Sequence, residues 1–186
     1  MTTRLKEKKL SSKRVYRGSL LDIYVDEVEI FNGSTRVREY TKHPGAAAVI
    51  PVLPDGKIGL IRHYRYPTDQ IHIEIPAGKI DRGENLEVTA RRECQEEIGF
   101  LPQKLTFLTK INPCIGYSDE AIWLYLGEDL IKAKLSHTED ESIEFFPSTF
   151  ADTLRLVWEG KISDVKTIIS ILWLDKLIRS KKVEIL

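Results

Sequence analysis

Three glutamates crowd one short stretch of the sequence. Glu93, Glu96 and Glu97 are spaced i, i+3 and i+4, so on a helix their carboxylates would share one face. Like charges at this spacing repel, and each such pair costs about 0.2–0.5 kcal/mol in an exposed helix. A divalent cation bound by the carboxylate oxygens would turn that small cost into a large gain. The spacing therefore predicts a metal site.

A helix over residues 85–98 is needed to position these glutamates. Asn85 is a good N-cap residue, and Gly99 ends the helix in the usual way. Apolar side chains recur at every fourth position and predict a ridge that packs on a sheet: Leu86, Ala90, Cys94 and Ile98. The glutamates would lie along the adjacent flank. Just upstream, Pro76 and Gly78 end a short strand and force a turn.

The N-terminal segment contains a basic arm and a predicted hairpin. Residues 1–13 are rich in lysine and arginine, and we expect them to form a loosely attached arm. Asn32-Gly33 lies between two runs of alternating β-formers and predicts a hairpin over residues 15–43. Because an isolated hairpin is only marginally stable, it should pack on the main domain or on a partner subunit.

The rest of the chain alternates predicted strands and helices. Asp55-Gly56 predicts a second hairpin that joins a buried strand over residues 46–53 to a strand over residues 57–66. Further strands are predicted at 71–75, 105–111, 121–126 and 143–146, and two helices at 150–158 and 164–178. This pattern favours an α/β fold.

The composition excludes several classes of function. The 28 lysines and arginines balance the 28 aspartates and glutamates, so nucleic-acid binding is not expected. The two cysteines fit a reducing cytoplasm, and the four histidines lack zinc-site spacing. The apolar runs are too short to span a bilayer, and no apolar region of a signal peptide follows the basic N-terminus. We expect a cytoplasmic protein with no membrane contact.

The stretch that holds the three glutamates resembles the Nudix box, G-x5-E-x7-R-E-U-x-E-E-x-G-U, where U is an apolar residue. Its fixed positions here are Gly78, Glu84, Arg92, Glu93, Glu96, Glu97 and Gly99. All seven fixed letters match, which has a chance probability on the order of 10⁻⁸ per window. One departure is Cys94 in a slot usually filled by an aliphatic residue, and cysteine behaves as a small hydrophobe.

Segments outside the box resemble the ADP-ribose pyrophosphatase and nucleoside-diphosphate-sugar hydrolase branch of this family. They are Tyr64–Pro67, Glu74–Gly78 and Gly160–Thr167. The resemblance implies an α/β/α sandwich with a mixed central β-sheet, usually in a homodimer in which the N-terminal strands contribute to the partner's site. We therefore expect residues 1–44 to form the arm and hairpin, with a dimer contact, and residues 45–186 to form the Nudix hydrolase domain.

The same resemblance implies roles for residues of the box. Glu93 and Glu97 correspond to direct ligands of Mg²⁺, or of Mn²⁺ in its place, and Glu96 to a further or water-mediated ligand with a catalytic role. The carbonyl of Ala77 would complete the site. Arg92 is placed to orient a glutamate through a charged hydrogen bond and so to support catalysis.

The general base and the substrate contacts lie outside the box. In this branch a glutamate on a distant loop often activates the water, and Glu139 and Glu141 stand in an acidic stretch at that place. We expect one of them to be the base, with Glu141 favoured, whereas the alternative is a solvated acidic loop. Arg62, Arg65 and Tyr117 are the candidate contacts to phosphate or base.

The expected reaction is metal-dependent hydrolysis of the diphosphate bond of ADP-ribose or a related nucleoside diphosphate sugar. The products would be a nucleoside monophosphate and a sugar phosphate. One alternative is a Nudix hydrolase of nucleoside triphosphates, dinucleoside polyphosphates or capped RNA, against which the upstream hairpin and the Glu74–Gly78 segment argue. A second is a non-catalytic ADP-ribose sensor, which would have no need of the glutamate cluster.

Overall fold

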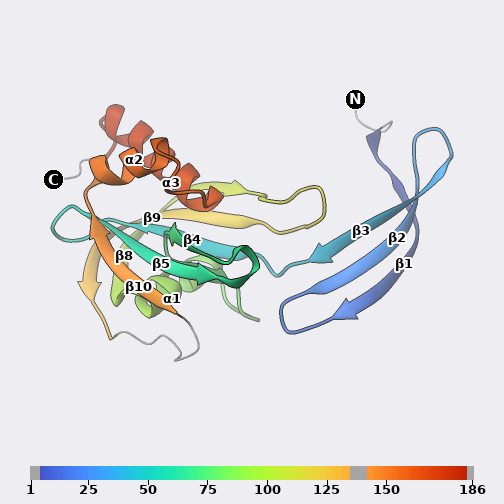
Figure 1. The fold of residues 1–186 in the computed structure, drawn as a ribbon, viewed down its shortest axis with the longest axis horizontal. Coiled ribbons are helices and arrows are strands. Elements are labelled where there is room, and N and C mark those ends of the chain that lie inside the picture. The colour runs from blue at the N-terminus through green and yellow to red at the C-terminus, as the bar shows by residue number, and fades with distance from the viewer. Residues whose placement is uncertain (1–4, 135–141, 184–186) are drawn as a thin grey trace. The chain divides into compact units, whose positions relative to one another are not determined.

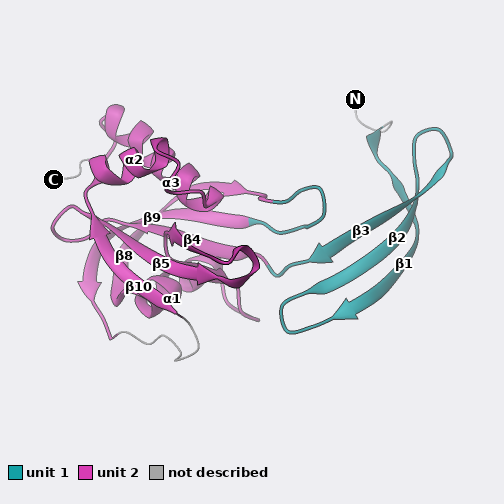
Figure 2. Cartoon of the chain, viewed as in Figure 1, with its two compact units in different colours: residues 1–44, 114–121 teal, residues 45–113, 122–186 magenta. Residues whose placement is uncertain are grey.

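The computed structural model of the protein describes residues 5–134 and 142–183. The chain divides into two compact units (Figure 2). The N-terminal unit comprises residues 1–44 with 114–121, and the main unit comprises residues 45–113 with 122–186. In the parts of the chain that are described, helices are too short or too polar to cross a membrane.

The N-terminal unit is built on a three-stranded antiparallel sheet, in the order β1-β2-β3 (Figure 1). Its strands are β1 (Lys8–Arg17), β2 (Asp22–Glu29) and β3 (Thr35–Lys42). The predicted hairpin is confirmed, because β2 pairs with β3 around a turn in which Gly33 has a φ of +82°. Residues 114–121 lie beside β3, where the amide of Thr41 donates to the carbonyl of Tyr117 at 2.9 Å.

The expected arm over residues 1–13 is wrong from Lys8 onward, because β1 begins there. This strand lacks the apolar alternation that marks most strands. Polar pairs across the sheet hold it instead: Ser12 donates to Asp26 at 2.5 Å, and the ammonium of Lys9 lies 3.1 Å from the same carboxylate. A search for apolar period-2 patterns therefore misses it.

The described residues of the main unit form two sheets and three helices. A mixed four-stranded sheet has the order β7-β4-β9-β8, and an antiparallel sheet has the order β10-β5-β6. The strands are β4 (Ala46–Pro51), β5 (Ile58–Arg65), β6 (Gln70–Glu74), β7 (Ala77–Lys79), β8 (Phe100–Ile111), β9 (Ile122–Lys132) and β10 (Ile143–Ser148). The helices are α1 (Leu86–Ile98), α2 (Phe150–Trp158) and α3 (Val165–Arg179), with a 3₁₀ turn at Tyr66–Thr68.

The turn predicted at Asp55-Gly56 is present, but the hairpin predicted around it is wrong beyond that turn, because β4 and β5 belong to different sheets. Only one bridge, Val52 with Ile58, joins the two segments next to the turn. Strand β4 is buried along its whole length and pairs in parallel with β9. An all-apolar strand of this kind suits the middle of a mixed sheet better than a hairpin with one solvent-exposed face.

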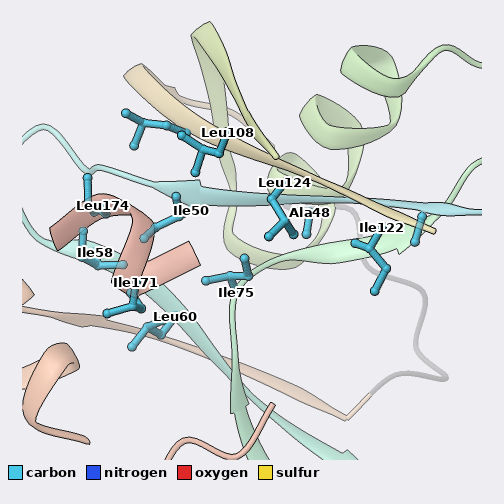
Figure 3. Packing of buried hydrophobic residues seen from close by; sticks show 12 residues of the cluster. Ala48, Ile50, Ile58, Leu60, Ile75, Leu108, Ile122, Leu124, Ile171 and Leu174 are labelled. Atoms are coloured by element: carbon cyan, nitrogen blue, oxygen red, sulfur yellow. The ribbon is translucent and has the colours of Figure 1, made fainter. Parts of the chain in front are cut away.

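The mixed sheet lies between two apolar clusters, one on each face. Alternate residues of β4 point to opposite sides, so Ala48 and Ile50 face the cluster that includes Ile171 and Leu174 of α3 (Figure 3). On the other face, Ala47 and Val49 pack in the cluster that holds the apolar ridge of α1. The expected α/β/α sandwich with a mixed central sheet is thereby confirmed.

Candidate active site

Helix α1 carries the glutamate cluster, as the sequence predicted. The side chain of Asn85 accepts a hydrogen bond from the amide of Val88 at 2.9 Å, and Gly99 ends the helix with a φ of +71°. The predicted ridge packs into the core with Ala90, Cys94 and Ile98 buried and Leu86 partly buried. On the neighbouring flank, Glu93 and Glu97 are only 9% and 4% exposed.

These two buried carboxylates lie against Ala77 and Gly78, the first residues of β7, where the chain leaves the bend at Pro76; we call this place the Ala77 turn. The amide of Ala77 donates to Oε2 of Glu97 at 3.0 Å. A Cβ atom at residue 78 would lie 2.0 Å from Oε1 of Glu93, so the carboxylate occupies space that any side chain would fill. Glycine is required at this position because the backbone and the carboxylate approach so closely.

Arg92 joins three carboxylates through its guanidinium group. Nη1 donates to Glu93 at 2.6 Å and to Glu96 at 3.0 Å, while Nε and Nη2 donate to the two oxygens of Glu84 at 2.9 and 3.0 Å. Nη2 also donates to the carbonyl of Lys79 at 3.1 Å. Hydrogen bonds to Glu84 and the charges around it raise the pKa of Arg92 further above its usual range. This geometry is that of a residue that orients carboxylates.

Glu84 fastens the loop before α1 to the helix. Besides Arg92, it accepts from the hydroxyl of Thr89 at 2.9 Å and from the amide of Asp81 at 3.3 Å. Hydrogen bonds from Arg92 lower the pKa of Glu84 to about 2, so it stays ionised at neutral pH. The loop and the glutamate-bearing face of α1 thus form one connected polar network.

The chemistry of this site suits a hard divalent cation. Carboxylate and carbonyl oxygens are the ligands that Mg²⁺ prefers, and Glu93 holds its carboxylate directly on the turn that contains Ala77. Over residues 5–134 and 142–183, no three His, Cys, Asp or Glu side chains already converge on a point that could hold an ion. Arg92 bridges Glu93 and Glu96 instead, so a bound cation would share these carboxylates with it.

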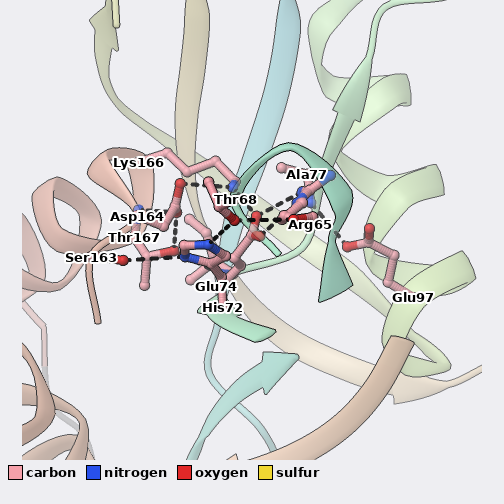
Figure 4. Close-up of polar contacts among 11 residues, drawn as sticks. Arg65, Thr68, His72, Glu74, Ala77, Glu97, Ser163, Asp164, Lys166 and Thr167 are labelled. Atoms are coloured by element: carbon pink, nitrogen blue, oxygen red, sulfur yellow. Dashed lines mark hydrogen bonds and ion pairs between the residues drawn. The ribbon is translucent and has the colours of Figure 1, made fainter. Parts of the chain in front are cut away.

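A second polar network, which the sequence analysis did not identify, lies on the other side of the same turn (Figure 4). Its centre is Glu74, which is 2% exposed and accepts from Nε and Nη2 of Arg65 at 2.7 and 2.8 Å. The ammonium of Lys166 contacts Glu74 as well as Asp164. Burial raises the pKa of Glu74, but the hydrogen bonds and charges of Arg65 and Lys166 outweigh it and lower that pKa to about 2.

One signal in the sequence could have indicated this network. Lys166 lies in a helix that packs Ile171 and Leu174 into the core, and it is only 7% exposed. A buried ammonium needs a carboxylate partner. Glu74 and Lys166 both lie in segments that carried the family resemblance, but no pattern in the sequence shows that these segments, 92 residues apart, meet.

The candidate substrate contacts lie in different surroundings. Arg65 is held by Glu74 with 41% of its side chain exposed. The guanidinium of Arg62 lies 4.0 Å from the centroid of the Phe146 ring, and its Nη1 lies 2.8 Å from Glu144. Arg62 also lines a cavity of about 330 Å³, together with Tyr64, Ile71, Ser142, Ile143 and Glu144.

The described structure does not place the remaining candidates relative to the box residues. Tyr117 belongs to the N-terminal unit, where its hydroxyl donates to Sγ of Cys114 at 3.2 Å. Glu139 and Glu141 lie outside the described residues. The structure therefore gathers the box residues and Ala77 at one place and leaves the predicted base and Tyr117 as predictions.

Comparison with known proteins identifies relatives over nearly the whole chain. The NUDIX domain model matches residues 42–162. An ADP-ribose pyrophosphatase of Bacillus subtilis (strain 168) is 39% identical over 173 residues, which cover 92% of this chain and 94% of the relative. A methanol dehydrogenase activator of Bacillus methanolicus is 36% identical over 171 residues, with 91% and 92% covered.

A solved structure shares the fold. The crystal structure of an ADP compounds hydrolase superposes with a TM-score of 0.87 and 24% sequence identity, covering 97% of this chain and 98% of the other. The domain match covers more than half of the chain. It includes the box residues that the structure gathers around the Ala77 turn. The chain belongs to the Nudix family.

Proposed function

We propose that this Nudix pyrophosphohydrolase cleaves the diphosphate bond of ADP-ribose or of a related nucleoside diphosphate sugar. The products are a nucleoside monophosphate and a sugar phosphate. The observation that carries the proposal is the pair of buried carboxylates, Glu93 and Glu97, held against the Ala77 turn. Relatives named ADP-ribose pyrophosphatase, which span most of the chain, support the choice of substrate class.

The site residues divide the work of the reaction. Glu93, Glu97, Glu96 and the carbonyl of Ala77 would hold Mg²⁺ or Mn²⁺, which when bound neutralises phosphate charge and acidifies water. Arg92 keeps the glutamates oriented through its hydrogen bonds. In the hydrolysis, the oxygen of water forms a bond to one phosphorus while the bridging oxygen leaves with the other phosphate.

Glu139 or Glu141, in the acidic stretch of the sequence, takes the proton of that water. We expect replacement of Glu141 by Gln to reduce kcat by about 10²–10⁴-fold, because a general base contributes a factor of this size. Glu139→Gln in the same acidic stretch tests the alternative base, and single-turnover rates of both variants decide between the two residues. A large loss in Glu139→Gln alone would make Glu139 the base. Near-full activity of both variants would refute a role for either glutamate in proton transfer.

Substrate recognition is assigned to arginines of β5 and to the loop after β8. Arg65 keeps 41% of its side chain exposed while Glu74 fixes its orientation, and the guanidinium donors that Glu74 does not occupy could contact a phosphate. Arg62 lines the cavity beside Tyr64, where a planar group could lie against aromatic and apolar surface. Tyr117 is 62% exposed and offers a ring face for stacking.

One assay tests the proposed function. The protein is incubated with Mg²⁺ and separately with Mn²⁺, together with ADP-ribose, other nucleotide sugars, dinucleoside polyphosphates and nucleoside triphosphates, and the products are identified. We expect a nucleoside monophosphate and a sugar phosphate, with nucleotide sugars cleaved fastest. Preference for triphosphates would refute the substrate class. Binding of ADP-ribose without turnover would indicate a sensor.

The N-terminal unit serves as the contact between two copies of the chain. Among its described residues, Val28 is the one apolar side chain that is buried, whereas others are exposed: Leu10, Val15, Tyr16 and Val37. A three-stranded sheet with so little core needs cover from another surface. We expect sedimentation equilibrium to give about twice the chain mass of 21.4 kDa. Replacing Val15 and Val37 by Glu should yield a monomer, and a monomeric unmodified protein would refute this contact.

A further inference from the structure

The first turn of α3 is tied to the backbone just before the Ala77 turn. Asp164, the N-cap of α3, accepts from the amide of Thr167 at 3.0 Å and from its hydroxyl at 2.5 Å. The same hydroxyl accepts from the amide of Ile75 at 2.9 Å. Thr167 and Ile75 are both fully buried. The hydroxyl therefore couples the cap of one helix to a backbone group that water does not reach (Figure 4).

Lys166 makes a second connection. It precedes Thr167 on α3, and its partner Glu74 precedes Ile75. Its ammonium contacts Glu74 and lies 3.1 Å from Asp164, with 7% of the residue exposed. Glu74 in turn receives both donors of Arg65. A long side chain with a buried charge has few alternative positions, because every displacement separates it from its partners.

These connections end at Glu74 and Ile75, three and two residues before Ala77, whose carbonyl is one of the proposed metal ligands. Glu74 and Ile75 lead directly into Pro76, whose carbonyl accepts from the amide of Val49 at 3.0 Å, and then into Ala77. From the opposite side Glu97 of α1 accepts from the amide of Ala77. The turn is thus held by α3 on one side and by α1 on the other.

We propose that Lys166 and Thr167 are positioning residues, which set the place of the Ala77 turn relative to the glutamates of α1. The inference rests on the proposed function, because it assigns these residues to the same metal site. Neither residue touches substrate or metal in this assignment. They act through Glu74 and Ile75, and contacts of this indirect kind typically change metal affinity or activity by about 10- to 100-fold when removed.

Thr167→Val tests the proposal, since valine keeps the shape of threonine and removes the hydroxyl. We expect the Kd for Mn²⁺, measured by titration calorimetry without substrate, to rise by about 10- to 100-fold, with a matching loss in kcat/KM. Amide hydrogen exchange should become faster at Ile75 and Ala77. Thr167→Ser retains the hydroxyl and should restore all three readouts to within about threefold of the unmodified protein.

Thr153→Val is the matched control on α2. Thr153 is also fully buried, and its hydroxyl donates to the carbonyl of Thr149 at 2.8 Å, away from the turn. Both valine variants should lose stability, but only Thr167→Val should lose Mn²⁺ affinity. Equal Mn²⁺ affinity in the two variants would overturn the inference while leaving the proposed function intact.

Two further outcomes can be told apart: a Thr167→Val variant that does not fold, and a failure of the proposed function itself. If Thr167→Val does not fold, Lys166→Met and Lys166→Arg test the second connection, and the proposal requires the arginine variant to bind Mn²⁺ more tightly than the methionine variant. Equal affinity of these two would overturn it. Absence of both Mn²⁺ binding and hydrolysis in the unmodified protein would instead overturn the proposed function, and this inference with it.

Discussion

Glu97→Gln is expected to reduce kcat for the hydrolysis of ADP-ribose by about 10²–10³-fold with Mg²⁺ present, because one of the proposed carboxylate ligands of the cation is lost. The fold should persist. The amide oxygen of glutamine can still accept the hydrogen bond that Ala77 donates at 3.0 Å, and the side-chain volume is unchanged. Steady-state rates over a range of Mg²⁺ concentrations would measure the effect, which should be partly relieved as the cation concentration rises.

Glu87→Gln is the control on the same helix. Glu87 is exposed in the first turn of α1, on a position that the proposed site does not use. The Glu87→Gln variant removes one negative charge from the helix, as Glu97→Gln does, and should leave kcat within about twofold of the unmodified protein. If Glu97→Gln kept a rate similar to that of Glu87→Gln, Glu97 would not be a metal ligand.

The sequence predicted helix α1 and its cluster well because the signals there are local. An N-cap at Asn85, a glycine at residue 99 and an apolar ridge four residues apart all specify the same helix. Its glutamates are fixed relative to one another by helix geometry alone. What the sequence could not show was that Glu93 lies on Gly78 and Glu97 on the Ala77 amide, since these contacts depend on how α1 packs against β7.

Predictions failed where a contact between distant segments decided the outcome. Strand β4 takes β9 as its parallel neighbour, although β9 lies some seventy residues further along the chain, so the local turn at Asp55-Gly56 gave a misleading pairing. Strand β1 is specified by polar partners across the sheet, such as Asp26, that no periodicity reveals. The buried Glu74 network is of the same kind, because α3 brings Lys166 to it.

That network carries the second large prediction. Glu74→Gln is expected to lower the free energy of unfolding by about 3 kcal/mol at pH 7, because Lys166 and Arg65 lose the buried carboxylate that both contact. Urea unfolding followed by circular dichroism would measure it. Glu144→Gln is the matched control, since it also removes the carboxylate partner of an arginine, at 2.8 Å, but in a pair whose carboxylate is 70% exposed.

A surface pair of this kind contributes about 0–1 kcal/mol, so the two variants should differ clearly at neutral pH. They should also differ in their response to acid. The folded-state pKa of Glu74 is lowered from 4.5 to about 2, so the folded protein keeps the carboxylate ionised where the unfolded chain protonates it. The stabilisation is therefore fully present above pH 4.5 and is lost as the pH falls through about 2.

In Glu74→Gln this contribution is absent at every pH. The gap in unfolding free energy between the unmodified protein and the variant should consequently narrow from pH 5 to pH 3, whereas the gap for Glu144→Gln should stay small throughout. A gap for Glu74→Gln that does not change with pH would mean that the loss comes from packing and not from the charge of Glu74. A gap that widens on acidification would mean that burial, which favours the protonated carboxyl, outweighs Arg65 and Lys166.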